Sequence, residues 1–336
     1  MLMHEDKNLP NIPGFKFRHF QGANDYTPMA SVITASELAD QSPRSVSEQD
    51  LASAYQHRLM NCDPYQDMIF AEVDGVMVGY NRGWWEQGES KQRWYVHHAF
   101  LHPQWRRKGI GRAMLQWMER HLREIAATHP PELEKLYEVS VSQFQKGASI
   151  LFERSGYQPV RYYYQMLRPT LDDIPLLPVP DGLEVRPATP DHYRQIWQSN
   201  AECSRDEWGH RELTEQDYQD WLHRPEFQPQ LWQVAWDVAS DQVAGQVLTY
   251  IHHEENQQFN RQRGYTEGIG VRRPWRRRGL ARALISLSLQ AQKATGMTES
   301  ALVVDTDNPS GAVRLYEDCG FRVAKRDTLY RKPVIL

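Results

Sequence analysis

Two short segments of the chain place clustered basic residues directly before a glycine and another small residue. They are RRKGIG at 106–111 and RRRGLA at 276–281. Each stands where an expected strand gives way to a long amphipathic helix, so unpaired backbone N–H groups and the helix dipole would face a bound anion. The small residues leave room for a pyrophosphate, and the basic side chains supply countercharge. Because it occurs twice, the pattern predicts a diphosphate-bearing ligand rather than only a tight helix start.

The two segments belong to a longer internal repeat. WRRKGIGRA at 105–113 matches WRRRGLARA at 275–283, and GASILFERSGY at 147–157 matches GAVRLYEDCGF at 311–321, in the same order. This period is far longer than that of solenoid repeats. The repeat therefore indicates duplication of a whole domain.

A proline-rich stretch separates the two copies. Residues 168–182 contain four prolines, which disfavour helix and central strand and favour an extended connector. The length of 336 residues also exceeds what one hydrophobic core usually fills. We therefore expect an N-terminal domain over residues 1–174 and a C-terminal domain over residues 175–336.

Both copies show the same order of expected elements: a helical pair, a β-hairpin, a third strand, a long helix, a short strand and a last helix. In the second copy these are 190–223, the hairpin 231–236 and 242–251, the strand 264–271, the helix 279–294, the strand 301–304 and a helix that Asn308 or Ser310 caps and Gly320 ends. In the first copy the clearest are 25–60, the hairpin 68–73 and 76–80, and the helix 109–125. The pattern predicts the α+β class, with two tandem domains that each hold a mixed, mostly antiparallel sheet flanked by helices.

Composition narrows the classes of function. The formal net charge is −4, which argues against a general nucleic-acid binder. No run approaches the about 18 apolar residues of a membrane span, and the first residues lack the pattern of a secretory signal. The three cysteines fit neither a disulfide framework nor a zinc spacing. We expect a cytoplasmic protein, a monomer or homodimer, without membrane or nucleic-acid partners.

The repeated segments resemble the signature of the GNAT acetyltransferases. In that family an Arg/Gln-x-x-Gly-x-Gly/Ala loop holds the acetyl-CoA pyrophosphate, and an Asn-x-x-Ala-x-x-Leu-Tyr-x-x-x-Gly-Phe motif follows. The second copy supplies the later motif, with the alanine one residue off the commonest spacing: Asn308, Ala312, Leu315, Tyr316, Gly320 and Phe321. The resemblance is strong over about residues 94–157 and 265–330. The tandem layout is similar to that of mycothiol synthase, in which the family pattern assigns catalysis to the C-terminal domain.

The resemblance implies acetyl-CoA as the acyl donor and coenzyme A as a product; from the spacing of the histidines we expect no metal. The residues that it assigns to the cofactor lie at a strand end, in the loop and at the helix start of each copy, and one lies in the later motif. In the second copy they are Ile269, Val271, Arg276, Arg277, Arg278, Gly279, Leu280, Ala281, Arg282 and Asn308. In the first copy they are Leu101, Arg106, Arg107, Lys108, Gly109, Ile110, Gly111 and Arg112.

In GNAT enzymes the amine attacks the thioester directly, which requires a base, a donor to the carbonyl oxygen and an acid for the thiolate. Glu267 stands where the family often places the base, and Tyr316 stands where it places the phenol that protonates the sulfur. The backbone N–H near Val271 would polarise the carbonyl. The alternatives are a surface strand position for Glu267 and plain packing for Tyr316.

The first copy departs from the family at both chemical positions. His97 takes the place of Glu267, and Phe152, which has no proton to give, takes the place of Tyr316. Phe144 stands where the second copy has Asn308. His97 would be a base at neutral pH, but we expect the N-terminal domain to be non-catalytic with an intact pyrophosphate loop.

Two pairs of histidines and one acidic segment are candidates for a metal site and for an acceptor site. His97-His98 and His252-His253 are neighbours on expected strands, where adjacent side chains point to opposite faces, so they do not predict a metal site. Asp206, Glu207 and Trp208 are candidates for recognition of an amine, or else form a solvated acidic turn.

We expect an N-acetyltransferase that acts on a primary amine of a small molecule. The alternatives are a peptide or protein N-terminus as acceptor, and a non-catalytic acyl-CoA sensor. Retention of Glu267 and Tyr316 in one copy speaks against the sensor, because binding alone needs neither side chain.

Overall fold

The computed structural model describes residues 9–41, 46–57, 59, 61–88, 91–210, 213–224, 226–308 and 311–336. The chain forms two compact units, Met1–Val160 with Asp327–Leu336, and Arg161–Arg326. They divide within the strand β6 (Gln158–Arg168), upstream of the sequence-based boundary between residues 174 and 175. The physical reason is that β6, the last strand of the first copy, pairs with the second unit from Tyr163 onward.

The first unit has an α+β fold with a six-stranded mixed sheet in the order β1-β2-β3-β4-β5-β14. All neighbouring strands are antiparallel except β4 and β5, which are parallel. The strands are β1 (Phe15–Arg18), β2 (Met68–Val73), β3 (Val76–Gln87), β4 (Gln92–Leu101), β5 (Glu134–Ser142) and the end of β14 (Arg322–Pro333). The helices are α1 (Tyr26–Ala39), α2 (Glu48–His57), α3 (Pro64–Asp67), α4 (Ile110–Ala127) and α5 (Lys146–Arg154), with 3-10 turns η1 (Ala23–Asp25) and η2 (Pro103–Trp105).

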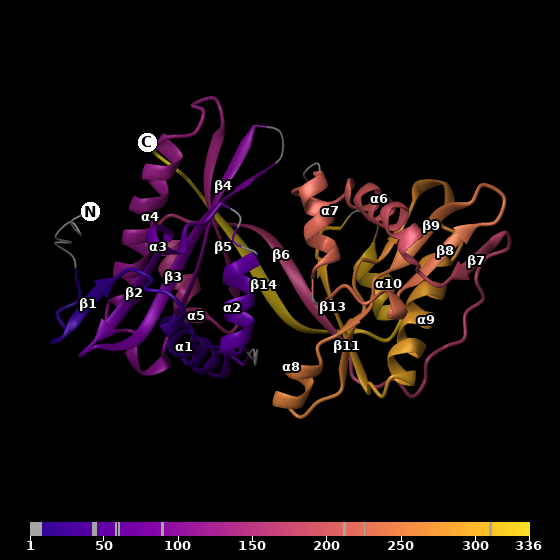
Figure 1. The fold of residues 1–336 in the computed structure, drawn as a ribbon, viewed down its shortest axis with the longest axis horizontal. Helices are drawn as coiled ribbons and strands as arrows, with labels where there is room; N and C mark the ends of the chain where they lie inside the picture. Colours follow the sequence, from indigo (N-terminus) through magenta and orange to yellow (C-terminus); the bar gives the residue numbers. More distant parts are fainter. Residues whose placement is uncertain are drawn as a thin grey trace. The chain divides into compact units, whose positions relative to one another are not determined.

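Helices cover both faces of the first sheet. Met68 and Phe70 pack with α1 and α2, whereas the alternate residues Ile69 and Ala71 pack with α4. Figure 1 shows α1 and α4 on opposite sides of β2 and β3. The alternation explains why β2 is apolar throughout, because a strand buried on both faces has no polar side.

The second unit divides its strands between two sheets. One has the order β6-β13-β11-β10, with β13 and β11 parallel, and the other is the antiparallel order β12-β9-β8-β7. The strands are β7 (Leu183–Arg186), β8 (Gln233–Asp237), β9 (Gln242–Val247), β10 (Tyr250–Ile251), β11 (Arg263–Tyr265), β12 (Gly270–Val271) and β13 (Glu299–Asp305). The helices are α6 (Tyr193–Ser204), α7 (Glu215–Leu222), α8 (His253–Gln258), α9 (Leu280–Ala294) and α10 (Ala312–Asp318), with η3 (Pro190–His192), η4 (Pro229–Leu231) and η5 (Arg273–Trp275).

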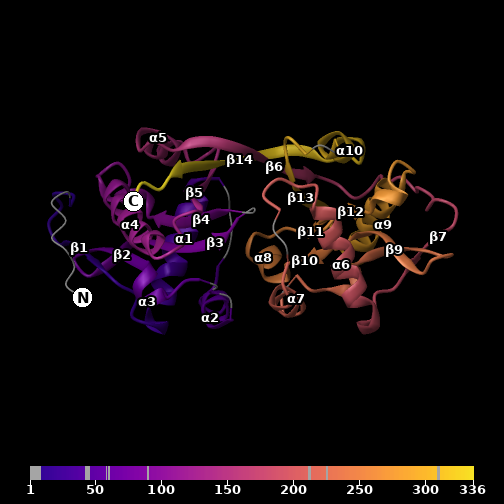
Figure 2. The same ribbon diagram turned by 90° about the horizontal axis from the view of Figure 1, so that it is seen from above.

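Two helices cover opposite faces of the β8–β9 hairpin. Ala235 and Ala244 pack with α9, whereas Val234 and Trp236 pack with Ile196 of α6. Figure 1 shows α6 and α9 on either side of these strands. Figure 2 shows α8 beside β10 and β11, so His252 and His253 lie at a helix start and not on a strand as expected. No helix within the described ranges is both long and apolar enough to cross a membrane.

The last strands of the two copies are exchanged between the units. Residues Asp327–Pro333 of β14 belong to the second sequence copy but pair with β5 in the first unit. Residues Tyr163–Arg168 of β6 belong to the first copy but pair with β13 in the second unit. Each unit therefore completes its sheet with a strand from the other copy.

The expected single strand over residues 264–271 is broken in the second unit. β11 pairs with β13 in one sheet, whereas β12 pairs with β9 in the other. Gly268 lies in the break with a left-handed φ of 56°, and a Cβ there would lie 2.8 Å from Leu248 Cγ. A glycine lets the chain make this bend beside a filled space. The counterpart β4 stays one strand along β3, although its pairing with β5 ends at Val96.

Candidate active site

In the second unit, the loop between η5 and α9 forms the candidate pyrophosphate site. Arg277 and Gly279 both have left-handed backbone, with φ of 62° and 87°. The N–H of Ala283 donates to the carbonyl of Gly279 at 3.2 Å, so the N–H groups before it lie at the open start of α9. Arg277, Arg278 and Gly279 are exposed there. This concave array of N–H groups and positive charge fits a pyrophosphate.

The first unit builds the same loop between η2 and α4. Arg107 and Gly109 have φ of 64° and 90°, and the N–H of Ala113 donates to the carbonyl of Gly109 at 3.1 Å. Arg107, Lys108 and Gly109 are exposed. The repeated sequence therefore gives two loops with one conformation.

The first arginine of each loop turns inward instead of toward the open side. Arg276 donates from Nε to the carbonyl of Val271 and from Nη1 to Asp206, both at 2.8 Å. Arg106 donates to the carbonyl of Leu101 at 3.2 Å and to Asp40 at 2.6 and 2.9 Å. These two side chains therefore brace the loop, and the later basic residues lie on its open side.

The other side chains assigned to the two loops differ in exposure. Leu280 and Ile110 are 1% and 0% exposed and anchor their helices in the cores. Arg278 donates to the carbonyl of Asp181 at 2.7 Å, and Arg282 forms an ion pair with Asp318. Small residues occupy the second helical position, Ala281 and Gly111, and Arg112 is exposed one residue later. The backbone of each loop, more than its charged tips, is therefore the fixed part of the site.

Glu267 lies at the strand break. The N–H of Thr266 makes the last backbone bond to β13, at the carbonyl of Ala301 (2.9 Å). The next N–H along the same edge of β13, that of Val303, donates to Oε1 of Glu267 at 3.0 Å. The carboxylate thus replaces the ladder partner that β13 loses where the strands diverge. Burial raises the pKa of Glu267 to about 7, the range in which a carboxylate is an effective general base.

A fully buried polar network fixes the residue before Glu267. Gln292 of α9 donates from Nε2 to the Thr266 hydroxyl at 2.8 Å and to the Ser288 hydroxyl at 3.1 Å. Thr266 also bonds Ser300 at 2.8 Å, and Ser288 bonds Thr249 at 2.6 Å. All five residues are 0% exposed. The helix that starts at the candidate pyrophosphate loop is therefore held to the segment after β11 that carries Glu267.

The backbone of β12 offers a donor toward the open side of the break. The N–H of Arg272 donates to Ala244 of β9 at 3.0 Å. Successive N–H groups of a strand alternate in direction, so the N–H of Val271 points away from β9. The side chains of Ile269 and Val271 pack on the core of the unit, as the side chain of Leu101 does in the first unit.

Tyr316 lies on α10 next to the same break. It is 7% exposed and packs in the core beside Phe321, with ring centres 6.4 Å apart. Burial raises its pKa, and the nearby carboxylates of Glu267 and Glu207 raise it further. The hydroxyl makes no hydrogen bond within the described residues. It is thus a protonated phenol close to the candidate base.

The cap of α10 differs from the expected one. Gly311 is the N-cap, with φ of 72° and no side-chain cap bond. Asn308 accepts at its carbonyl from the N–H of Gly311 at 3.2 Å and lies three residues before the N-cap. The alternative cap, Ser310, lies outside the described residues.

The corresponding place in the first unit has different chemistry. His97 is 4% exposed, its Nε2 lies 3.2 Å from the Tyr157 hydroxyl, and its Nδ1 has no hydrogen-bond partner among the residues that the structure describes. Burial lowers the pKa of His97 to about 3. Phe152 lies beside it, with ring centres 5.8 Å apart. This pair offers neither an accessible base nor an acid.

The three residues of the candidate amine-recognition segment, Asp206 to Trp208, make different contacts. Asp206 pairs with Arg273 and Arg276, so it braces the loop instead of facing an acceptor. Glu207 is exposed. The guanidinium carbon of Arg161 lies over the ring of Trp208, 5.4 Å from the centre of that ring. Sequence reasoning missed Arg161, because it belongs to the end of the first copy and no motif marks it.

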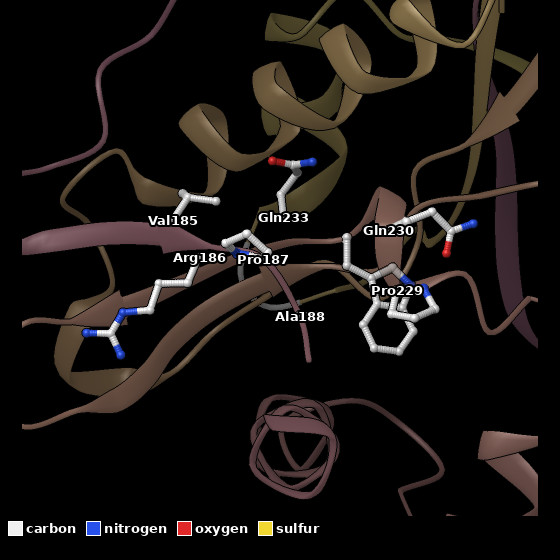
Figure 3. A pocket seen from close by; sticks show the side chains of 8 residues that line it. Val185, Arg186, Pro187, Ala188, Pro229, Gln230 and Gln233 are labelled. Atoms are coloured by element: carbon white, nitrogen blue, oxygen red, sulfur yellow. The ribbon is translucent and has the colours of Figure 1, made fainter. Parts of the chain in front are cut away.

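A pocket of about 580 Å³ lies at β7 and β8 in the second unit, and Figure 3 shows the side chains that line it. The pocket is lined by two short stretches of the chain, Val185, Arg186, Pro187 and Ala188, and Pro229, Gln230, Trp232 and Gln233. No residue assigned above to the acetyl donor, the base or the acid lines it. The candidate active site is therefore separate from this pocket.

A family model and the relatives with similar sequences both identify acetyltransferases. A model of the acetyltransferase (GNAT) family matches residues 33–157 and 193–321. The mycothiol acetyltransferases of Catenulispora acidiphila and Thermobifida fusca are 27% and 28% identical over 68% of this chain and 69% and 71% of their own lengths.

Solved structures match nearly the whole chain. A GCN5-related N-acetyltransferase from Sphaerobacter thermophilus is 25% identical, with a TM-score of 0.77 over 97% of this chain and 98% of that one. A tandem GNAT protein from the clavulanic acid biosynthesis pathway is 17% identical, with a TM-score of 0.69 over 96% and 99%. The second likeness concerns the fold.

Proposed function

The chain belongs to the GNAT family of acetyltransferases and is an N-acetyltransferase, and from this we propose that its second unit transfers acetyl from acetyl-CoA to a primary amine of a small molecule. The observation that carries the choice of unit is the contrast at the strand break. The second unit has Glu267 with a pKa of about 7 beside a phenol, whereas the first has a buried His97 beside Phe152.

Acetyl-CoA fits the second unit at two places. The pyrophosphate would lie on the N–H groups at the start of α9, with Arg277 and Arg278 as countercharge. The thioester carbonyl would accept from the N–H of Val271, which points away from β9 at the break. Bound acetyl-CoA supplies a thioester whose carbonyl carbon is open to attack.

Three groups of the chain then divide the chemistry. Glu267 takes a proton from the acceptor ammonium, and the freed nitrogen lone pair forms the C–N bond. The Val271 N–H stabilises the negative charge that develops on the carbonyl oxygen. As the C–S bond breaks and its electron pair goes to sulfur, the Tyr316 hydroxyl donates a proton to the thiolate. The nitrogen's second proton restores the Tyr316 phenol through solvent.

For the first unit we propose acetyl-CoA binding without turnover. Its loop repeats the left-handed pair and the exposed basic residues of the second unit, and Gly109 and Gly111 leave the same room for a pyrophosphate. The buried ring of His97, and Phe152 in the position that Tyr316 has in the second unit, argue against acyl transfer there.

The names of the relatives bear on the acceptor. The relatives are named for a small molecule, mycothiol, which favours a small acceptor over a peptide N-terminus. Release of coenzyme A in the presence of a panel of small primary amines tests this directly. Acetylation of peptide N-termini with no small amine accepted would replace the proposal by its peptide alternative.

A Tyr316→Phe variant tests the acid. We expect kcat to fall about a hundredfold with KM for acetyl-CoA nearly unchanged, because the phenol acts only as the thiolate leaves. The reciprocal Phe152→Tyr change in the first unit should leave turnover as it is, since no accessible base accompanies it. Unchanged turnover in Tyr316→Phe would remove the acid role.

A further inference from the structure

Arg161 joins three segments of the second unit near Glu267. Its Nε lies 2.9 and 2.8 Å from the two carboxylate oxygens of Asp305, and its guanidinium lies over the ring of Trp208. Arg161 belongs to β6, Asp305 ends β13, and Trp208 follows α6. One side chain therefore fixes the segment after α6 against the end of β13.

This contact places Glu207 beside the strand break. Val303, whose N–H holds the carboxylate of Glu267, is two residues before Asp305, so both lie on one side of β13. With Trp208 held at Asp305, its neighbour Glu207 lies close to Glu267. Electrostatics agree with this placement: burial is the main cause of the raised pKa of Glu267, and the charge of Glu207 adds to it.

Two polar groups at this place have no hydrogen-bond partner in the part of the chain that the structure describes. Glu207 is exposed, and its carboxylate makes no hydrogen bond or ion pair within the described residues. The hydroxyl of Tyr316, a residue only 7% exposed, makes none in that part of the chain either. The neighbouring Asp305 and Asp307 are instead held by Arg161. A ligand that brings positive charge and hydrogen-bond donors would satisfy both open groups.

We propose that Glu207 binds the ammonium group of the acceptor, and that Arg161 is the positioning residue that holds Glu207 beside Glu267. The proposal rests on catalysis in the second unit and narrows the acceptor to amines that arrive as cations. Held by Glu207, the ammonium gives one proton to Glu267, and its lone pair then attacks the thioester. A neutral amine gains nothing from this carboxylate.

Benzylamine and aniline are matched probe acceptors, because at about pH 7.5 the first is protonated and the second is neutral. In Glu207→Gln, KM for benzylamine should rise about tenfold to hundredfold, with KM for aniline and for acetyl-CoA unchanged. The low-pH limb that Glu267 gives to the rate profile should also move to lower pH, because a repelling carboxylate is gone. Loss of packing alone would not move this limb.

Substitution of Arg161, and of the exposed pair Arg194 and Glu215, completes the test. Arg161→Gln should raise KM for benzylamine in the same direction but less. Glu215→Gln and Arg194→Gln are the controls, because Arg194 makes the same two contacts, with a carboxylate and an aromatic ring, at Glu215 and Tyr218. We expect both controls to behave as the wild type.

Calorimetric titration of benzylammonium into wild type and Glu207→Gln separates this inference from the proposed function. Binding that is lost in the variant supports the ammonium site even if benzylamine is not acetylated, which would count against the proposed function alone. Equal binding by both proteins, or no binding by the wild type, overturns the inference. So does an equal rise of KM for benzylamine and aniline.

Discussion

A Glu267→Gln variant should lose acetyl transfer by about a hundredfold to ten-thousandfold in kcat/KM for the acceptor amine, the usual contribution of a general base. The amide keeps an oxygen that accepts from the N–H of Val303, so the strand break is expected to persist. It takes up no proton from the ammonium. Acetyl-CoA binding, measured by calorimetry, should stay as in the wild type, because no hydrogen bond or ion pair among the described residues joins Glu267 to either pyrophosphate loop.

The pH dependence distinguishes a base from a structural carboxylate. Burial raises the pKa of Glu267 to about 7, and a base must be deprotonated, so wild-type kcat/KM should fall about tenfold per pH unit below that value. The residual activity of Glu267→Gln should lack this limb. Glu299→Gln, which removes a carboxylate of β13 that pairs with Arg263, is the control. A pH–rate profile that is the same in Glu267→Gln and wild type would exclude the base role.

The raised pKa of Glu267 makes activity rise with pH but makes the free energy of unfolding fall with pH. Between the usual carboxyl pKa and about 7, the folded protein keeps a proton on Glu267 that the unfolded chain releases. The contribution of this group to the free energy of unfolding therefore declines as pH rises through that window and stays low above it. Glu267→Gln should accordingly gain in Tm, relative to wild type, more at about pH 8 than at about pH 5.

Deletion of residues 327–336 should destabilise the first unit by about 5 kcal/mol or more, a large part of the stability of a domain. The deletion removes the partner of β5 and the Tyr330 side chain, which is 5% exposed. It also leaves the half-buried Glu138 and Glu119 without Arg331 and Lys332, which now lie 2.7 and 2.8 Å away. Breaking a buried ion pair by removing one partner costs about 3–5 kcal/mol.

Hydrogen exchange reports this loss element by element. We expect fast exchange in β4, β5 and α4 after the deletion, while the β8–β9 hairpin and α9 of the second unit stay protected. Deletion of Ile335 and Leu336 alone, which are 77% and 62% exposed, is the control and should change little. If the amides of β5 exchange as slowly in the protein without residues 327–336 as in the wild type, the exchanged strand is dispensable.

The repeat and its helix starts could be predicted from the sequence because they depend on local chemistry. A glycine before an apolar periodic run sets a helix start, and α4 and α9 begin at Ile110 and Leu280, directly after the two glycines. The α+β class and the tandem GNAT architecture could be predicted because each copy carries its own order of strands and helices. The family match and the similar solved structure confirm both predictions.

The exchanged strands and the broken strand could not be predicted, because they depend on partners distant in sequence. Nothing in residues 322–333 indicates β5 as a neighbour instead of a strand of the same copy. The segment 264–271 is uniform enough to predict one strand, yet Gly268 and Leu248 bend it between two sheets. Likewise Arg106 and Arg276 satisfy the motif, but their direction depends on Asp40 and Asp206 in distant helical segments.

Titration of acetyl-CoA into wild type, Gly279→Glu and Gly109→Glu, with turnover measured on the same samples, tests most directly that the second unit is the catalytic one. A Cβ at Gly279 meets no atom within 4 Å and one at Gly109 only Pro10 at 3.5 Å, so neither substitution crowds the core, although the left-handed φ of each glycine strains the loop backbone around any side chain placed there. We expect Gly279→Glu to lose one binding site and turnover, and Gly109→Glu to lose the other site and keep turnover. Turnover that survives Gly279→Glu, or that disappears only with Gly109→Glu, would contradict this assignment.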